Sequence, residues 1–158
     1  MTQHLARGRR TYVASDIDAE HLARLRVRFR GRPNLSIRKC DLSDPADFSE
    51  FGAQFDSVVC LNVVEHLEDD LGALRNIRSA LKPGGRAIIL VPQDQAVYGT
   101  LDEVLGHVRR YSAAQLQSRM EEAGFAVERI LQFNRITRPG WRVNGQLLRR
   151  RSFGRVRR

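Results

Sequence analysis

The sequence contains few cysteines and no long apolar run, and each scarcity excludes a class of protein. The longest apolar run covers residues 87–91, far short of the ~18 residues needed to cross a bilayer. Cys40 and Cys60 lie in apolar, strand-like runs, so we expect buried free thiols rather than a disulfide. No apolar stretch follows the first arginines, so we expect no signal peptide. These features predict a cytoplasmic protein, and 158 residues predict one folded domain.

Lysine is almost absent, and the net charge of +9 comes from arginines near the end of the chain. All 18 acidic residues lie at or before Glu128, and ten arginines follow it. Removing these ten from the 27 basic residues leaves 17 against 18 acidic ones, a balance of −1. We therefore divide the chain into a near-neutral domain, residues 1–133, and an arginine-rich segment, residues 134–158.

Strand-like and helix-like segments alternate along the near-neutral domain. Short β-rich runs predict strands, and apolar residues three and four apart predict helices. The expected strands cover residues 11–15, 35–40, 55–61, 86–91 and 125–133. The expected helices cover residues 19–30, 71–81 and 112–123, and polar connections cover 42–54 and 92–111, the latter with one helical turn near Asp102. This order predicts an α/β fold with a mainly parallel sheet and helices on both faces.

Acidic side chains follow the first two expected strands, at the sheet edge where such folds bind ligands. Asp16 follows the first strand, and its carboxylate can accept hydrogen bonds from two vicinal ribose hydroxyls. Asp41 follows the second strand and can accept from an exocyclic amine of a nucleobase, while the backbone of Leu42 contacts the ring edge. Taken alone, each aspartate is equally a helix cap or turn residue, as is Asp18. Their separation by one βαβ unit makes the pair more informative than either acid.

Five segments together resemble the class I S-adenosylmethionine-dependent methyltransferases. In chain order they are similar to the family's second-strand motif, its adenine-binding motif, its fourth-strand motif, the turn into its fifth strand and the late part of its domain. They are residues 13–18 (VASDID), 40–42 (CDL), 55–67 (FDSVVCLNVVEHL), 81–86 (LKPGGR) and 106–112 with 123–125. The resemblance implies a Rossmann-like methyltransferase fold and S-adenosylmethionine as the cofactor. The cofactor-binding residues it implies are Asp16, Ile17, Asp41, Leu42, Asn62 and Val63.

The family's first strand and its glycine-rich loop (Gly-x-Gly-x-Gly), which cradles the methionine part of the cofactor, have no counterpart in this sequence. Gly8 is the sole glycine before Val13. In the family's sheet order, 3-2-1-4-5-7-6, that strand lies between strands 2 and 4, so we expect two unpaired strand edges and a slot between them. No apolar strand follows Phe133 to complete the late hairpin. We therefore expect a fragment, truncated at both ends, that binds S-adenosylmethionine weakly or not at all.

The expected catalytic residues are Glu65, His66 and His107. Methyl transfer needs a base only when the acceptor must lose a proton, and histidine titrates in the useful range. Some quinone O-methyltransferases of this family hold a divalent metal with a Glu-His pair and a glutamate three residues earlier. That earlier position is Asn62 here, so we expect no metal. The alternative for His66 is a histidine that caps or packs on the following helix.

His107 lies in a basic loop that is expected to cover the acceptor. Its neighbours Arg109 and Arg110 can clamp a phosphate or a carboxylate. The alternative is a solvated loop in which His107 is bonded to the backbone.

Two functions remain open from the sequence. The first is an enzyme that methylates a small molecule or a glycan or lipid-linked acceptor, because the resemblance is closest to bacterial members joined to sugar-transferring domains. The second is a non-catalytic remnant that acts as a basic binding module. Its arginine-rich segment, read as a helix, would lie on an anionic surface at the periphery of the inner membrane. Aromatic residues among the arginines also suit RNA, but nucleic acid is the less expected partner.

Overall fold

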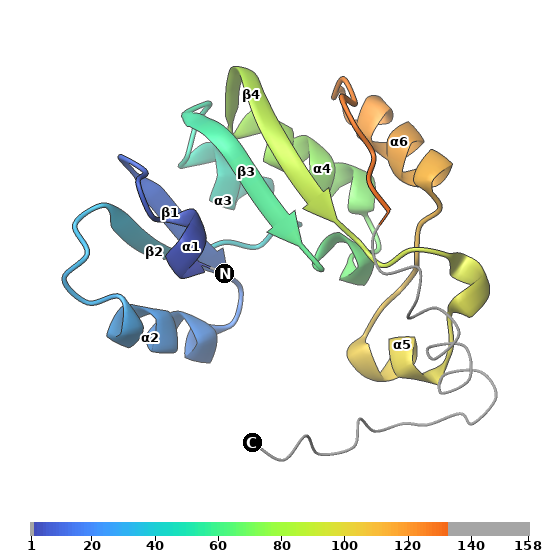
Figure 1. Cartoon of the computed structure of the whole chain (residues 1–158), viewed down its shortest axis with the longest axis horizontal. Coiled ribbons are helices and arrows are strands. Elements are labelled where there is room, and N and C mark those ends of the chain that lie inside the picture. The colour runs from blue at the N-terminus through green and yellow to red at the C-terminus, as the bar shows by residue number, and fades with distance from the viewer. Residues whose placement is uncertain (1, 133–158) are drawn as a thin grey trace.

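Four strands form two separate two-stranded parallel sheets in the computed structural model, which describes residues 2–132 (Figure 1). Strand β1 (Tyr12–Asp16) pairs with β2 (Leu35–Lys39), and β3 (Phe55–Leu61) pairs with β4 (Leu81–Leu90). A helix lies in the crossover within each pair, as parallel pairing requires. The prediction of an α/β fold with parallel strands is therefore confirmed.

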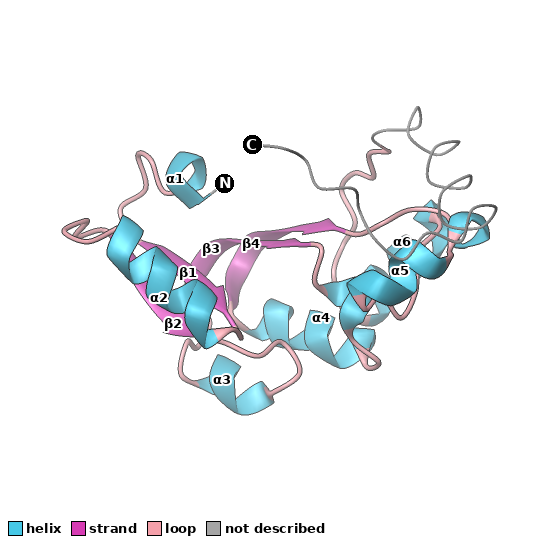
Figure 2. Cartoon of the chain, turned by 90° about the horizontal axis from the view of Figure 1, so that it is seen from below, coloured by secondary structure: helices cyan, strands magenta, loops and turns pink. Residues whose placement is uncertain are grey.

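Six α-helices and two 3₁₀ turns accompany the strands in residues 2–132. The helices are α1 (Thr2–Leu5), α2 (Ala19–Arg28), α3 (Pro45–Ser49), α4 (Asp70–Ser79), α5 (Thr100–Leu105) and α6 (Ala113–Glu122), and the turns are η1 (Val64–His66) and η2 (Gln95–Val97). Figure 2 shows α1 on one side of the strands and α3 and α4 on the other. In this part of the chain, no helix has the length and apolar character of a membrane span.

The helix ends follow the local chemistry of the sequence. Asp18 caps α2, since its carboxylate accepts from the amides of Glu20 and His21. At α6, the Ser112 hydroxyl accepts from the Gln115 amide, and the Gln115 side chain accepts from the Ser112 amide, which completes the expected capping box.

Two expected stretches differ clearly from the structure. The connection at 42–54 contains α3, because Asp44 caps a helix whose first residue is proline rather than forming a simple turn. Leu81 begins β4 instead of ending α4, and the pairing of β3 with β4 shifts register between Phe55 and Ser57. Gly84, at φ 77°, accommodates this irregularity.

The expected last strand at 125–133 is wrong over the residues that can be described, because 125–132 form no strand. A side-chain contact, from Arg86 Nε to the Glu128 carboxylate at 3.1 Å, joins this segment to β4. The alternating apolar pattern alone does not make a strand, since a strand also needs a neighbour for its backbone groups. Phe133 and the arginine-rich segment lie outside the described residues.

The hydrophobic core lies mainly around β3, β4 and α4. Its most buried side chains include Val64, Leu74 and Ile77, each at most 1% exposed. Phe48 of α3 and Tyr111, which precedes α6, pack into the same cluster. Cys40 and Cys60 are also buried in this cluster and are free thiols, as the sequence predicted.

The facing edges of β1 and β3 have no strand partner within residues 2–132, and they border a shared cavity. Its volume is about 710 Å³, and it is lined by every residue of β1 and by six residues of β3. Figure 1 shows β1 and β3 running in the same direction. The slot expected between these two strands is therefore present, and it continues to the carboxyl ends of both strands.

Candidate functional site

Two acidic residues predicted to bind one ligand lie at neighbouring strand ends. Asp16 is the last residue of β1 and pairs in register with Lys39 of β2, and Asp41 follows two residues later. Both aspartates line the 710 Å³ cavity, as do Ile17 and Leu42. The structure therefore brings these four predicted cofactor-binding residues to one cavity, and a fifth, Val63, lines it as well.

Local hydrogen bonds occupy part of each carboxylate. Asp16 Oδ1 accepts from the Asp18 amide at 3.0 Å, and Oδ2 lies 3.4 Å from His21 Nδ1. The Asp16 side chain remains 37% exposed, so it can still accept from a ligand. Asp41 Oδ1 accepts from the Ser43 amide at 2.8 Å, which makes Asp41 a turn residue as well. The helix-cap role that was the alternative for Asp16 and Asp18 belongs to Asp18.

The other two predicted cofactor-binding residues follow β3 and behave differently. Val63 lines the cavity and is 38% exposed. Asn62 is absent from the cavity lining, but its φ of 53° places it in the left-handed region, which non-glycine residues rarely adopt. Its amide donates to the Leu90 carbonyl at 2.8 Å. Asn62 therefore turns the chain sharply between β3 and η1.

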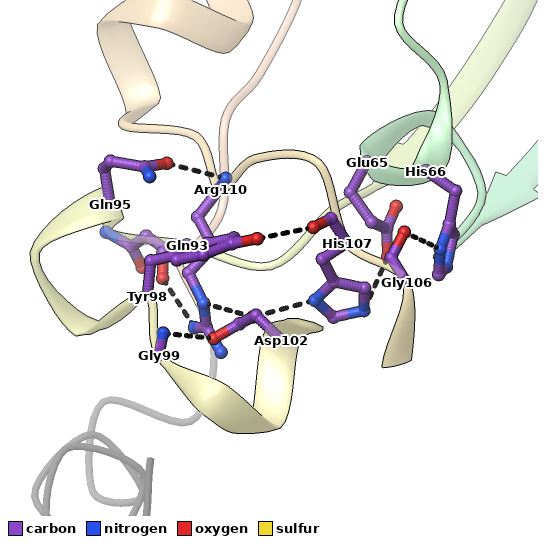
Figure 3. A network of polar contacts seen from close by, with 10 residues as sticks. All are labelled: Glu65, His66, Gln93, Gln95, Tyr98, Gly99, Asp102, Gly106, His107 and Arg110. Atoms are coloured by element: carbon purple, nitrogen blue, oxygen red, sulfur yellow. Dashed lines mark hydrogen bonds and ion pairs between the residues drawn. The ribbon is translucent and has the colours of Figure 1, made fainter. Parts of the chain in front are cut away.

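The three expected catalytic residues form a second group. Glu65 and His66 belong to η1, and His107 follows α5. One candidate ligand atom from each residue lies within 4.8 Å of the others. Figure 3 shows the Glu65 carboxylate beside the His107 ring, with His107 Nε2 4.0 Å from Glu65 Oε1. The rings of His66 and His107 meet edge to face, with centroids 4.9 Å apart.

Hydrogen bonds at Nδ1 hold both imidazoles (Figure 3). His66 Nδ1 donates to the Gly106 carbonyl at 2.9 Å. His107 Nδ1 donates to Asp102 Oδ1 at 2.8 Å. A neutral imidazole carries one proton, so these bonds assign it to Nδ1 and leave the lone pair on Nε2. In its neutral form each histidine therefore presents an unprotonated Nε2. The backbone-bonded alternative for the His107 side chain is wrong, because its partner is a carboxylate.

Glu65 is fully buried, and neither of its carboxylate oxygens has a hydrogen-bond partner. Burial raises the pKa of the Glu65 carboxyl, and its own backbone amide, the nearby imidazoles and Arg110 only partly oppose this effect. A buried carboxylate without hydrogen bonds is costly. This cost makes Glu65 a candidate for a functional role.

The basic loop is not a free anion clamp. Arg109 forms an ion pair with the buried Asp70 at 3.0 Å and donates to the Glu68 carbonyl. Arg110 Nε donates to Asp102 Oδ1 at 2.7 Å, and its NH1 donates to the Gln93 carbonyl. Both guanidinium groups are committed to internal partners, so the predicted phosphate or carboxylate clamp is wrong for this arrangement. The solvated-loop alternative is also wrong, since Arg110 is buried.

Asp102 and Gly106 position the two histidines, and the sequence interpretation missed this role. Asp102 is fully buried and holds His107 and Arg110 on one oxygen, while its other oxygen accepts from the Gly99 amide. Gly106 contributes only its carbonyl. The available signal was an acid in the first turn of a short helix, five residues before a histidine.

Comparisons with known proteins show that the chain is similar to methyltransferases. The family model of a methyltransferase domain matches residues 1–87. An S-adenosylmethionine-dependent methyltransferase of Mycolicibacterium smegmatis is 32% identical over 121 residues, which are 75% of this chain and 45% of that protein. The chain thus spans less than half the length of this relative.

Solved structures share the fold. An S-adenosylmethionine-dependent methyltransferase from Mesorhizobium loti superposes with a TM-score of 0.62 at 18% identity, over 80% of this chain and 68% of that one. The trans-methyltransferase CalH in complex with SAH superposes with a TM-score of 0.58 at 26% identity, over 73% of this chain and 36% of that one. Since the family model covers more than half of the chain, the chain belongs to the class I S-adenosylmethionine-dependent methyltransferases.

Proposed function

We propose that this chain takes part in S-adenosylmethionine-dependent methyl transfer, with the adenosine half of the cofactor at the carboxyl ends of β1 and β2. The observation that carries the proposal is that Asp16 and Asp41, on adjacent parallel strands, line one cavity. Ligands of open α/β sheets bind at this edge. The cavity volume of about 710 Å³ falls within the range of small-molecule sites.

The residues present fit an adenosine group. The half-exposed carboxylate of Asp16 can accept from vicinal ribose hydroxyls. Ile17 is 57% exposed and Val63 38% exposed, and both line the cavity, so apolar surface is available to an adenine ring. The sequence contains no Gly-x-Gly-x-Gly segment for the methionine half. We therefore expect most of the binding free energy to come from contacts with the adenosine half.

The acceptor side of the proposed site is the group of Glu65, His66 and His107. The cofactor supplies an electrophilic methyl group, and these residues act on the acceptor. An unprotonated Nε2 can take the proton of an acceptor hydroxyl. His66 is exposed, whereas His107 is 10% exposed, so His66 is the side chain that a small molecule can reach first. We propose a hydroxyl-bearing small molecule, or a glycan or lipid-linked glycan, as the acceptor class.

A titration followed by amide NMR tests the cofactor part of this proposal. SAH and adenosine should each shift the amide signals of Asp16, Ile17 and Asp41, and SAH should bind at most about tenfold more tightly than adenosine, a difference of ~1.4 kcal/mol. Absence of these shifts with both ligands would contradict the proposed site. Binding of SAH more than about a hundredfold tighter than adenosine would contradict the assignment of binding to the adenosine half.

Transfer of a labelled methyl group tests the acceptor part. Phenols, free glycans and lipid-linked glycans should be offered at equal concentration, with a matched set in which the hydroxyl is already methylated. Product formed only from the unblocked set supports the proposal. Product formed equally from both sets would show that the methyl group goes to another atom.

A further inference from the structure

The group of Glu65, His66 and His107 has the composition and hydrogen bonding of a metal site. We propose that these three side chains bind one divalent cation of the zinc class. The sequence led us to expect no metal, because Asn62 stands where a further acid would be needed. The structure supplies the third ligand from a different place, the loop after α5.

The distances are those of ligands close to a shared centre. The three candidate ligand atoms lie within 4.8 Å of one another. Tetrahedral zinc with bonds of ~2.0–2.1 Å separates its ligand atoms by about 3.3 Å. Binding therefore draws the most distant pair together by at most about 1.5 Å. The exposed ring of His66 has room to make this adjustment, while Glu65 and His107 are held in the buried part of the cluster.

The hydrogen bonds at Nδ1 prepare both imidazoles to act as ligands. Metal-binding histidines nearly always donate their second ring N–H to a carboxylate or a backbone carbonyl, which fixes the tautomer. Here His107 donates to the Asp102 carboxylate and His66 donates to the Gly106 carbonyl. Arg110 binds the same Asp102 oxygen at 2.7 Å and holds that carboxylate in place. Both Nε2 lone pairs are available for a cation, which would then occupy the position that a proton takes in the cation-free chain.

Glu65 supplies the charge that such a cation would neutralise. Its carboxylate is fully buried and neither oxygen has a hydrogen-bond partner. The Arg110 guanidinium, which also acts on this carboxyl, already contacts Asp102 and the Gln93 carbonyl. A divalent ion would satisfy the buried carboxylate directly, whereas without an ion the same group is desolvated and unbonded. The unpaired acid and the two prepared histidines point to the same ligand.

The ligand set also selects the class of metal. Two imidazoles and one carboxylate suit zinc and related transition metals, whereas Mg²⁺ prefers oxygen ligands. Three protein ligands leave one position open in a tetrahedral site. Because His66 is exposed, solvent can reach the cluster and this open position. It can therefore take water or an oxygen of another molecule.

Calorimetric titration of the full chain with Zn²⁺, without any cofactor, tests the proposal. One ion should bind per chain, and Mg²⁺ at the same concentration should give no binding. His66→Ala should weaken Zn²⁺ binding at least tenfold, because the exposed ring is a ligand but not part of the core. The matched control His21→Ala removes another exposed histidine, which lies beside Asp16, and should leave the affinity unchanged.

Two further measurements distinguish the proposed ligands from other metal-binding groups of the chain. Asp102→Asn should weaken binding ~10–100-fold, as loss of a partner behind a metal ligand does, and a Co²⁺ spectrum should show nitrogen and oxygen ligands without thiolate bands. Binding that survives His66→Ala unchanged, or that is lost on mutation of Cys40 and Cys60 to serine, would overturn the proposal. Since no cofactor is added, failure here leaves the proposed function intact, and failure of SAH binding leaves the metal site intact.

Discussion

Replacing Asp16 by alanine should weaken cofactor binding without unfolding the chain. The carboxylate lines the cavity and is 37% exposed. Its contacts within the chain are one bond from the Asp18 amide at 3.0 Å and an approach to His21 at 3.4 Å. Both partners are exposed to water, so little structure depends on this side chain.

The size of the effect follows from the bonds that the carboxylate can make. A hydrogen bond to a charged group contributes ~1.5–3 kcal/mol when shielded from water. Two ribose hydroxyls would double this value, but the partial exposure of Asp16 and its bond to the Asp18 amide reduce it. We therefore expect a net loss of ~1.5–3 kcal/mol, or about 10- to 150-fold in the affinity for SAH or adenosine.

Asp18→Ala is the matched control, because it removes a neighbouring carboxylate with a different role. Asp18 accepts from the Glu20 and His21 amides and caps α2. Its loss should lower the melting temperature while leaving adenosine affinity within about twofold. Titration calorimetry and thermal melts measure the adenosine affinity and the melting temperature of each variant. If Asp18→Ala weakened binding as much as Asp16→Ala, the assignment of Asp16 as the ribose-binding residue would be refuted.

Three further outcomes are expected. Tyr111→Phe removes a 2.8 Å bond to the buried Asp70 and should lower the free energy of unfolding in urea by about 1.5 kcal/mol. No change would show that the two arginines paired with Asp70, Arg109 and Arg119, satisfy that carboxylate without the tyrosine. Burial raises the pKa of Cys60 to about 12 and of Cys40 to about 11, so iodoacetamide should alkylate both thiols far more slowly in the folded chain than in urea, and similar rates would contradict this. Burial also raises the pKa of Glu65, so the folded state retains a proton that the unfolded state has lost, and the free energy of unfolding should fall as pH rises between the two pKa values. In metal-free buffer Glu65→Gln should remove this slope, and an unchanged slope would assign it to another group.

The strands and the longer helices could be predicted because their signals are local. Residues 55–61 form β3 as expected, since an apolar run bounded by polar residues is itself the signal. The helix that Ser112 caps has its whole start encoded within four residues. The short α3 was missed because five residues carry little periodicity, and its anchor Phe48 becomes visible only when it packs into the core.

The candidate site could be predicted only in its residue types. The pairing of Asp16 with Asp41 followed from the βαβ connection, which places successive strand ends side by side. No such rule predicts that η1 contacts the loop after α5. His66 reaches the Gly106 carbonyl 40 residues away, and the Val108 amide donates to the Glu65 carbonyl. These contacts depend on tertiary packing, so the role of Asp102 also remained invisible in the sequence.

The division of the strands into two pairs has a consequence for cooperativity. β1, α2 and β2 pack on one another, and β3, β4, α4 and α6 form a second unit that contains most of the buried core. Units with different amounts of buried apolar surface open with different free energies. Native-state hydrogen exchange should therefore be faster in β1 and β2 than in β3 and β4.

A molecule that fills the cavity contacts both units at once, since β1 and β3 line it together. Ligand binding to the folded state alone adds RT ln(1 + [L]/Kd) to its stability. Binding therefore raises the free energy needed to separate the two units. Amides of the weaker unit should be the first to gain protection from hydrogen exchange. With the cavity empty, the two units should open in separate steps. With the cavity filled, they should open together.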